Sequence, residues 1–176
     1  MPAQIDRPVP SPVCCVVMGV SGCGKTSIAQ RLGGRLGIVH LEGDSYHSPA
    51  SVTKMAAGIA LTDDDRADWL LRLKSEIASR REKGEGVVLS CSALKRRYRD
   101  LLRSADPGLL FFHLVGTRDL IADRMQRRSD HYMPLSLLDS QFRDLEPLED
   151  DEAGLCLDIS ENPEKIVNTI LHALQS

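Results

Sequence analysis

The stretch VVMGVSGCGKTSIAQRL, residues 16–32, changes character twice within a short length of chain. The apolar and β-branched run 13–18 that leads into it is typical of a buried strand in a parallel sheet. Three glycines within six residues follow, which predicts a tight turn. From Lys25 onward, the apolar residues Ile28 and Leu32 lie four apart, so they share one face of a predicted helix. The stretch therefore predicts a strand, a glycine-rich loop and a helix in direct succession.

Within this loop, Gly19, Gly24, Lys25 and Thr26 match the pattern G-x-x-x-x-G-K-[ST] in full. Glycine adopts backbone conformations closed to other residues, so successive N–H groups can point into one hollow, and the following helix adds the positive end of its dipole. Such a hollow binds the phosphates of a nucleoside triphosphate, with Lys25 at the β- and γ-phosphates and the Thr26 hydroxyl on Mg²⁺. The alternative, a glycine-rich turn that binds nothing, is disfavoured by the complete pattern in its strand-to-helix context. The predicted nucleotide-binding residues are Gly19, Ser21, Gly22, Cys23, Gly24, Lys25, Thr26 and Ser27.

The composition is that of an ordinary globular domain. The 176 residues are 42% hydrophobic and 27% charged, and their net charge of −3 gives no reason to expect a nucleic acid or an anionic membrane as partner. No apolar run approaches the roughly 20 residues of a membrane helix. Five cysteines without a C-x-x-C pair suggest neither a disulfide framework nor a zinc site, so we expect a cytoplasmic location. Residues 1–12 contain four prolines and no signal-peptide pattern, and we expect a flexible leader before one domain at 13–176.

Apolar, strand-like runs alternate with helical patterns along the rest of the chain. We expect strands at 13–18, 38–41, 87–91, 109–115 and 155–159. We expect helices at 25–36, 63–83, 94–103, 119–128, 135–145 and 163–174, the second of them capped by Asp63 or Asp64. This alternation predicts an α/β fold, a five-stranded parallel sheet with helices on both faces. The breaks near 45–60 and 129–136 are predicted to be irregular, mobile segments of the same domain.

Asp44 follows the second predicted strand, within HLEGDSYH. In an open α/β sheet ligands bind at the carboxyl ends of the strands, so we expect Asp44 to face the same crevice as the glycine-rich loop. A carboxylate there can accept a proton from an attacking hydroxyl or hold Mg²⁺ through water, and the alternative is an ordinary aspartate that turns the chain. No Asp ends the third predicted strand, which leaves more of the metal binding to Asp44.

Basic residues occur at three further places near the same predicted edge. Arg66 lies in the first turn of a predicted helix, where its charge opposes the helix dipole, and this suggests a contact with an anionic acceptor. Lys95 and Arg99 lie four apart on the helix after the third strand, which predicts an anion-binding face. Arg124 and Arg128 end a helix before SDHYMP, where they either complement the dipole or belong to a lid that closes over the triphosphate.

Four blocks of the sequence closely resemble the small P-loop gluconokinases, which are relatives of shikimate kinase and the nucleoside monophosphate kinases. The blocks are GVSGCGKTSIA, EGDSYH through KMAAGIALTDDDRADWL, CSALKRRYRDLLR and HYMPLSLLDSQFRDLEPLEDDE. The resemblance implies a P-loop kinase fold with a substrate-side flap at about 45–80 and a short lid at about 124–136. It also implies Mg²⁺-dependent transfer of the γ-phosphoryl group of ATP to the 6-hydroxyl of D-gluconate. The product, 6-phospho-D-gluconate, would feed carbohydrate acid catabolism and the pentose phosphate pathway.

The same resemblance implies roles for individual residues. The expected catalytic residues are Lys25, Asp44, Arg124 and Arg128, of which the two arginines also bind nucleotide; Thr26 and Asp44 are the expected metal ligands. The expected acceptor-binding residues are Asp44, His47, Lys54, Arg66, Ser92, Lys95, Arg99 and His131. At position 51 the chain has Ser51 where the family has Asn, which removes an amide that reads a sugar hydroxyl. The segment 159–163 resembles the place where the family holds the adenine base, and a homodimer is expected.

Two other functions stay open at this point. One is a kinase for another small metabolite, such as shikimate or a nucleoside monophosphate. The other is a nucleotide-binding module that senses ATP without transferring a phosphoryl group. Asp44 and the basic face argue against a sensor, because a sensor needs no acceptor pocket.

Overall fold

The computed structural model describes residues 12–127 and 134–175, so nearly all of the predicted leader and the middle of the predicted lid lie outside the described residues. Within them, five strands form one sheet in the order β2-β3-β1-β4-β5, and every neighbouring pair is parallel. The strands are β1 (Cys14–Met18), β2 (Val39–Glu42), β3 (Val87–Ser90), β4 (Leu110–Val115) and β5 (Gly154–Asp158). The predicted α/β fold with a five-stranded parallel sheet is confirmed.

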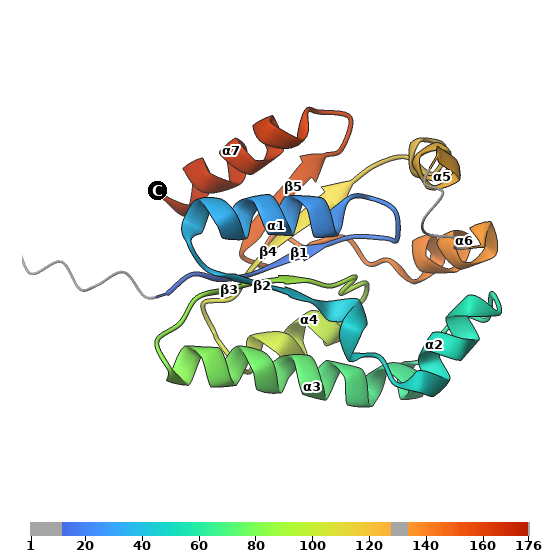
Figure 1. Cartoon of the computed structure of the whole chain (residues 1–176), viewed down its shortest axis with the longest axis horizontal. Coiled ribbons are helices and arrows are strands. Elements are labelled where there is room, and N and C mark those ends of the chain that lie inside the picture. Colours follow the sequence, from blue (N-terminus) through green and yellow to red (C-terminus); the bar gives the residue numbers. More distant parts are fainter. Residues whose placement is uncertain (1–11, 128–133, 176) are drawn as a thin grey trace, which may run out of the picture.

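Helices cover both faces of the sheet. In Figure 1, α1 and α7 lie on one face and α3 and α4 on the other, while α2, α5 and α6 gather at the right, at the same end as the turn from β1 into α1. The helices are α1 (Lys25–Leu36), α2 (Pro49–Ala56), α3 (Asp63–Glu82), α4 (Arg96–Arg103), α5 (Arg118–Arg127), α6 (Leu135–Asp144) and α7 (Pro163–Leu174), with a 3₁₀ helix, η1 (Gly43–Tyr46), after β2. Among the described residues, no helix combines the length and the apolar character needed to cross a bilayer.

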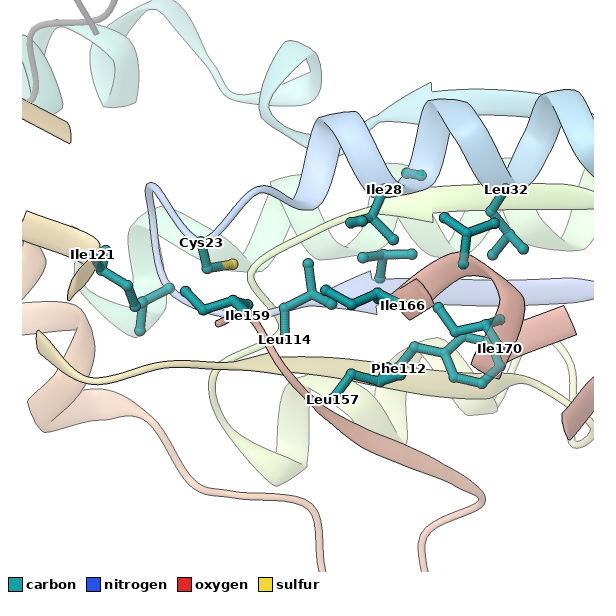
Figure 2. Close-up of a cluster of buried hydrophobic side chains, with 14 of the residues drawn as sticks. Cys23, Ile28, Leu32, Phe112, Leu114, Ile121, Leu157, Ile159, Ile166 and Ile170 are labelled. Atoms are coloured by element: carbon teal, nitrogen blue, oxygen red, sulfur yellow. The ribbon is translucent and has the colours of Figure 1, made fainter. Parts of the chain in front are cut away.

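The alternation of side chains along β1 divides the core into two layers. Cys15 and Val17 pack in the layer that includes α1 and α7, whereas Val16 and Met18 pack in the layer that includes α3 and α4. Because β1 is buried on both faces, its sequence is apolar throughout rather than alternating. Burial of one large aliphatic side chain stabilises the fold by about 1.5–3 kcal/mol. The first layer includes Ile28, Leu32, Phe112, Leu114, Ile166 and Ile170 (Figure 2).

The segment after β2 is more regular than its sequence predicts. The run that contains Ser48 and Pro49 was expected to be irregular, yet α2 begins at Pro49. The Ser48 hydroxyl accepts a hydrogen bond from the Ser51 N–H at 3.1 Å and caps the helix, and Pro49 suits its first turn. The same residues that break a helix in its interior therefore start one here.

The start of α3 also differs from its prediction. The N-cap is Thr62, not Asp63 or Asp64. The Thr62 hydroxyl accepts from the Asp65 N–H at 3.1 Å, and the Asp65 carboxylate accepts from the Thr62 N–H at 2.9 Å, which forms a capping box. Asp63 and Asp64 follow inside the first turn, where their negative charges complement the helix dipole.

A buried ion pair joins α4 to the segment before β5. Arg99 and Glu152 both have side chains with 0% exposure, and Arg99 Nε lies 2.7 Å from Glu152 Oε1. Arg99 also donates to the carbonyl oxygen of Ala93 at 2.9 Å, which fixes the loop after β3. Burial opposes the ionisation of Glu152, but hydrogen bonds from Arg99, the Glu149 N–H and Arg103 outweigh it and lower its pKa to about 2. Glu152 and backbone carbonyls engage the Arg99 guanidinium, so the structure gives Arg99 a structural contact, and the acceptor contact expected of it stays a prediction.

Replacing Glu152 with Ala is expected to lower the free energy of unfolding by about 3–5 kcal/mol, because the change leaves a buried guanidinium unpaired. Urea denaturation followed by circular dichroism measures the loss. Glu149→Ala is the matched control, since Glu149 pairs with Arg96 and its side chain is 59% exposed. The control is expected to cost at most about 1 kcal/mol. Similar losses for the two variants would contradict a special role for the buried pair.

Candidate functional site

The loop between β1 and α1 has the backbone geometry of a phosphate-binding turn. Gly19, Gly22 and Gly24 have φ angles of 149°, 79° and 97°, in the region that favours glycine. A Cβ on Gly22 would lie 2.5 Å from Cγ of Met125, so the loop packs directly against α5. Gly24 is the N-cap of α1 without a side-chain cap, and the first turn of α1 holds no acidic residue. The N–H groups and dipole of this helix end therefore suit an anion.

The side chains of this loop divide between the core and the crevice. Cys23 is 1% exposed and belongs to the apolar cluster of Figure 2, and burial raises the pKa of its thiol. Any contact of Cys23 with a nucleotide is therefore made by its backbone. Lys25 lies at the pocket described below, and its Nζ donates to the Val20 carbonyl oxygen at 2.9 Å. Thr26 is exposed and Ser27 half-buried in the first turn of α1.

A carboxylate that the sequence analysis did not single out lies beside Thr26. The Thr26 hydroxyl donates to Glu42 Oε2 at 2.5 Å, and Glu42 is the last residue of β2. Hydroxyl and carboxylate oxygens are the ligands that Mg²⁺ prefers, and at nucleotide sites Mg²⁺ uses one or two protein oxygens together with phosphates and water. Among the described residues, no three His, Cys, Asp or Glu side chains form a metal site by themselves. The oxygens of Thr26 and Glu42 fit a Mg²⁺ ion that also binds phosphates.

One pocket connects the glycine-rich loop to the predicted acceptor side. Six of the predicted residues line it: Ser21, Lys25, Asp44, His47, Arg66 and Ser92. They come from the loop, from η1 and its end, from α3 and from the segment after β3, so the fold joins positions that are far apart in the sequence. The remaining lining residues are Met55, Ala60, Leu61, Trp69, Leu137, Ser140 and Gln141.

Aromatic packing fixes the turn that carries Asp44. The His47 ring stacks on Trp69 with centroids 4.3 Å apart and planes 17° apart, and its Nε2 lies 3.7 Å from Asp44 Oδ1. Trp69 Nε1 in turn donates to the Gly43 carbonyl oxygen at 2.8 Å. The contact between Trp69 and Gly43 was not predicted from the sequence, because it requires α3 and η1 to meet.

Arg66 brings a positive charge to the wall of the pocket. The residue is 6% exposed, and its NH1 group lies 3.0 Å from the Tyr98 hydroxyl and 3.3 Å from Asp144 Oδ2. His113 on β4 is also buried. Burial, and then the positive charges of Arg99 and Lys25, lower its pKa to about 4. His113 is therefore neutral at neutral pH, and the positive charge of this edge comes from lysine and arginine.

Several predicted residues do not line this pocket. Lys54 Nζ lies 2.9 Å from Asp65 Oδ1, and Lys95 Nζ lies 3.1 Å from Asp63 Oδ1, so both ammonium groups are paired at the start of α3. The Ser51 side chain packs against Ser48 and is buried. Arg124 NH2 donates to the Ile159 carbonyl oxygen at 2.6 Å, which links α5 to the segment after β5. Arg128 and His131 lie outside the described residues.

Comparisons with known proteins agree with this geometry. A protein-family model described as an AAA domain matches residues 15–148. The gluconokinase of Gluconobacter oxydans is 44% identical over 161 residues, which cover 92% of this chain and 90% of the relative. Among solved structures, a gluconokinase from Sinorhizobium meliloti 1021 superimposes with a TM-score of 0.85 at 43% identity, covering 94% of this chain and 93% of that one. An unliganded sugar kinase from Janibacter sp. HTCC2649 has a TM-score of 0.90 at 44% identity, covering 93% and 95% of the two chains.

The residues matched by the family model include the glycine-rich loop and the segments that form the acceptor side of the pocket. Identity above 40% over about nine-tenths of both chains shows the family of this chain. With its parallel sheet, its phosphate-binding loop and these relatives, the chain belongs to the gluconokinase family of P-loop kinases.

Proposed function

We propose that the protein is an ATP-dependent gluconokinase, which transfers the γ-phosphoryl group of ATP to the 6-hydroxyl of D-gluconate. The observation that carries the proposal is the single pocket shared by Lys25 of the phosphate-binding loop and by Asp44, His47 and Arg66 of the acceptor side. The 44% identity to the gluconokinase of Gluconobacter oxydans supports gluconate as the acceptor. A pocket with both a carboxylate and a guanidinium suits an acceptor that carries hydroxyl groups and one negative charge.

On the acceptor side, Asp44 orients the 6-hydroxyl and accepts its proton as the oxygen attacks the γ-phosphorus. Arg66 is the proposed partner of the gluconate carboxylate, because a guanidinium binds a carboxylate through paired hydrogen bonds. His47 supplies a further contact, because its Nδ1 is buried and has no hydrogen-bond partner among the described residues. A hydroxyl of gluconate would satisfy that nitrogen. Ser92 lines the same wall and is the remaining proposed acceptor contact.

On the nucleotide side, the N–H groups from Gly22 to Lys25 bind the phosphates, and the Lys25 ammonium exchanges the Val20 carbonyl for the β- and γ-phosphates. Thr26, with Glu42 and Asp44, would hold Mg²⁺, which neutralises charge on the phosphate oxygens when it is bound. The Arg124 contact with Ile159 places its guanidinium beside the segment proposed to hold adenine. Arg128 and His131 complete the proposed lid.

We also propose a homodimeric, cytoplasmic enzyme. The family resemblance supports the dimer, and five free cysteines suit a reducing compartment. The flap, at about 45–80, then corresponds to α2 and most of α3, which carry Met55, Arg66 and Trp69 on the pocket wall.

The first prediction of this function concerns Lys25. Lys25→Ala is expected to lower kcat with gluconate by at least about 10³-fold, because the γ-phosphoryl group loses the positive charge that stabilises it during transfer. A coupled assay of ADP release measures the loss. Lys83→Ala, at the exposed C-cap of α3, is the control and is expected to match the parent protein. Appreciable turnover by Lys25→Ala would overturn the assignment of the phosphate-binding loop.

The second prediction concerns Asp44. Asp44→Asn is expected to lower kcat by about 10²–10⁴-fold while the Kd of ADP changes little, because an amide cannot accept the proton of the attacking hydroxyl. Steady-state kinetics and calorimetric titration with ADP separate the two effects. Asp119→Asn provides a matched control, since the Asp119 side chain is 97% exposed on α5. If kcat of Asp44→Asn stayed within a few-fold of the parent value, Asp44 would have no part in proton transfer.

The third prediction distinguishes the acceptor. In an ADP-release assay with gluconate, shikimate and nucleoside monophosphates, only gluconate is expected to give rapid turnover, with kcat/KM at least about 10²-fold above the others. Preference for another acceptor would leave a kinase of different specificity. Tight ATP binding without turnover on any acceptor would instead favour a nucleotide-binding module.

A further inference from the structure

Helix α6 places a carboxamide directly on the phosphate-binding loop. Gln141 Oε1 lies 2.6 Å from the backbone nitrogen of Ser21, although the two residues are 120 positions apart. Ser21 and Gln141 also line the same pocket as Asp44 and Lys25. Gln141 lies in one of the four blocks that resemble the gluconokinases, but the sequence alone assigns no role to it.

The core and two ion pairs hold α6 firmly in this position. Leu137 and Leu138 are 3% and 0% exposed, so one face of the helix is part of the hydrophobic core. Arg118 of α5 pairs with Asp139 at 2.5 Å, and Arg66 of α3 pairs with Asp144 at 3.3 Å. Gln141 therefore reaches Ser21 from an anchored helix, and its distance to the loop is set by packing on both sides.

The chemistry of the contact fixes the orientation of the carboxamide. A backbone N–H can only donate, so Gln141 must present its oxygen to Ser21, and its NH₂ group lies on the other side. In this state the carboxamide oxygen uses one of the N–H donors of the loop that is built to bind phosphate oxygens. A terminal phosphate that uses the Ser21 N–H must displace the Gln141 oxygen, and the released carboxamide can then turn its NH₂ group toward that phosphate.

We propose that Gln141 is a further catalytic and specificity-determining residue. Its carboxamide releases the Ser21 N–H when ATP binds and contacts the terminal phosphate instead. Because ADP lacks that phosphate, this contact distinguishes ATP from ADP beside the acceptor. The proposal rests on the proposed function, because it assigns Gln141 to the γ-phosphoryl group that is transferred. It gives a function to the contact that Gln141 of α6 makes with the phosphate-binding loop at the wall of the pocket. The donated N–H bonds add to those of the loop on the transferred group, where developing charge makes such donors effective.

Two substitutions separate the parts of this exchange. Gln141→Glu keeps an acceptor for the Ser21 N–H but puts a negative charge next to the terminal phosphate. It is expected to weaken binding of a non-hydrolysable ATP analogue at least about 10-fold relative to ADP. Gln141→Met keeps the length of the side chain and removes both polar groups. It is expected to lower kcat with gluconate at least about 10-fold while the Kd of ADP stays within about twofold.

Calorimetric titration with the analogue and with ADP, followed by steady-state kinetics, provides these values. Arg143→Met, on the exposed side of α6, is the matched control and is expected to leave both the analogue-to-ADP affinity ratio and kcat unchanged. Thermal unfolding confirms that each variant is folded; a purely structural Gln141 would lower the melting temperature without changing the affinity ratio. If both Gln141 variants keep the parent ratio and the parent kcat, the proposal is wrong. If the parent protein itself fails to phosphorylate gluconate, the proposed function fails, and the affinity ratios still decide the role of Gln141.

Discussion

The site depends on the abrupt change from strand to helix after β1. A central parallel strand that is buried on both faces delivers the chain to the carboxyl edge of the sheet, and three glycines with positive φ turn it into α1 within a few residues. The N–H groups at the start of α1 then lack helical partners, and the first turn itself holds no acidic residue, so these groups and the helix dipole favour an anion at this point. Ile28 and Leu32 hold α1 against the sheet, which keeps these donors in place without a ligand (Figure 2).

The acceptor side is assembled by contacts between elements that are distant in the sequence. His47 stacks on Trp69, Trp69 bonds to Gly43, and Arg66 contacts Tyr98 and Asp144, so η1, α3, α4 and α6 are joined around one pocket. Fully buried charge serves a different purpose in the same region. Arg99 and Glu152 neutralise each other in the interior and hold the loop after β3, which carries Ser92. Both Arg99 and Arg66 are buried, but only Arg66 lies at the pocket wall.

Local sequence patterns predicted those features of the fold that depend on interactions between neighbouring residues. The strands, the parallel sheet and the phosphate-binding loop follow from runs of apolar residues and from glycine, whose effects act over a few neighbouring positions. Helix starts were predicted less well. The sequence predicted an irregular segment around Pro49 and a cap at Asp63 or Asp64, whereas Ser48 and Thr62 cap α2 and α3 through side-chain hydrogen bonds. Glu42 was not predicted as a site residue, because only its contact with the Thr26 hydroxyl, which the sequence does not show, marks this carboxylate at the end of a strand.

The sequence by itself determined the fold class, the phosphate-binding loop and the family of this protein, because each depends on short, contiguous patterns of residues. Only the tertiary structure decided which basic residues belong to the pocket. The sequence predicts an anion-binding role for both Arg66 and Arg99. Arg66 lines the pocket, whereas Arg99 pairs with Glu152, 53 positions away. The tertiary structure likewise brought Gln141 to Ser21. Long side chains can reach several partners, and which partner they meet depends on how the helices pack rather than on the order of residues along the chain.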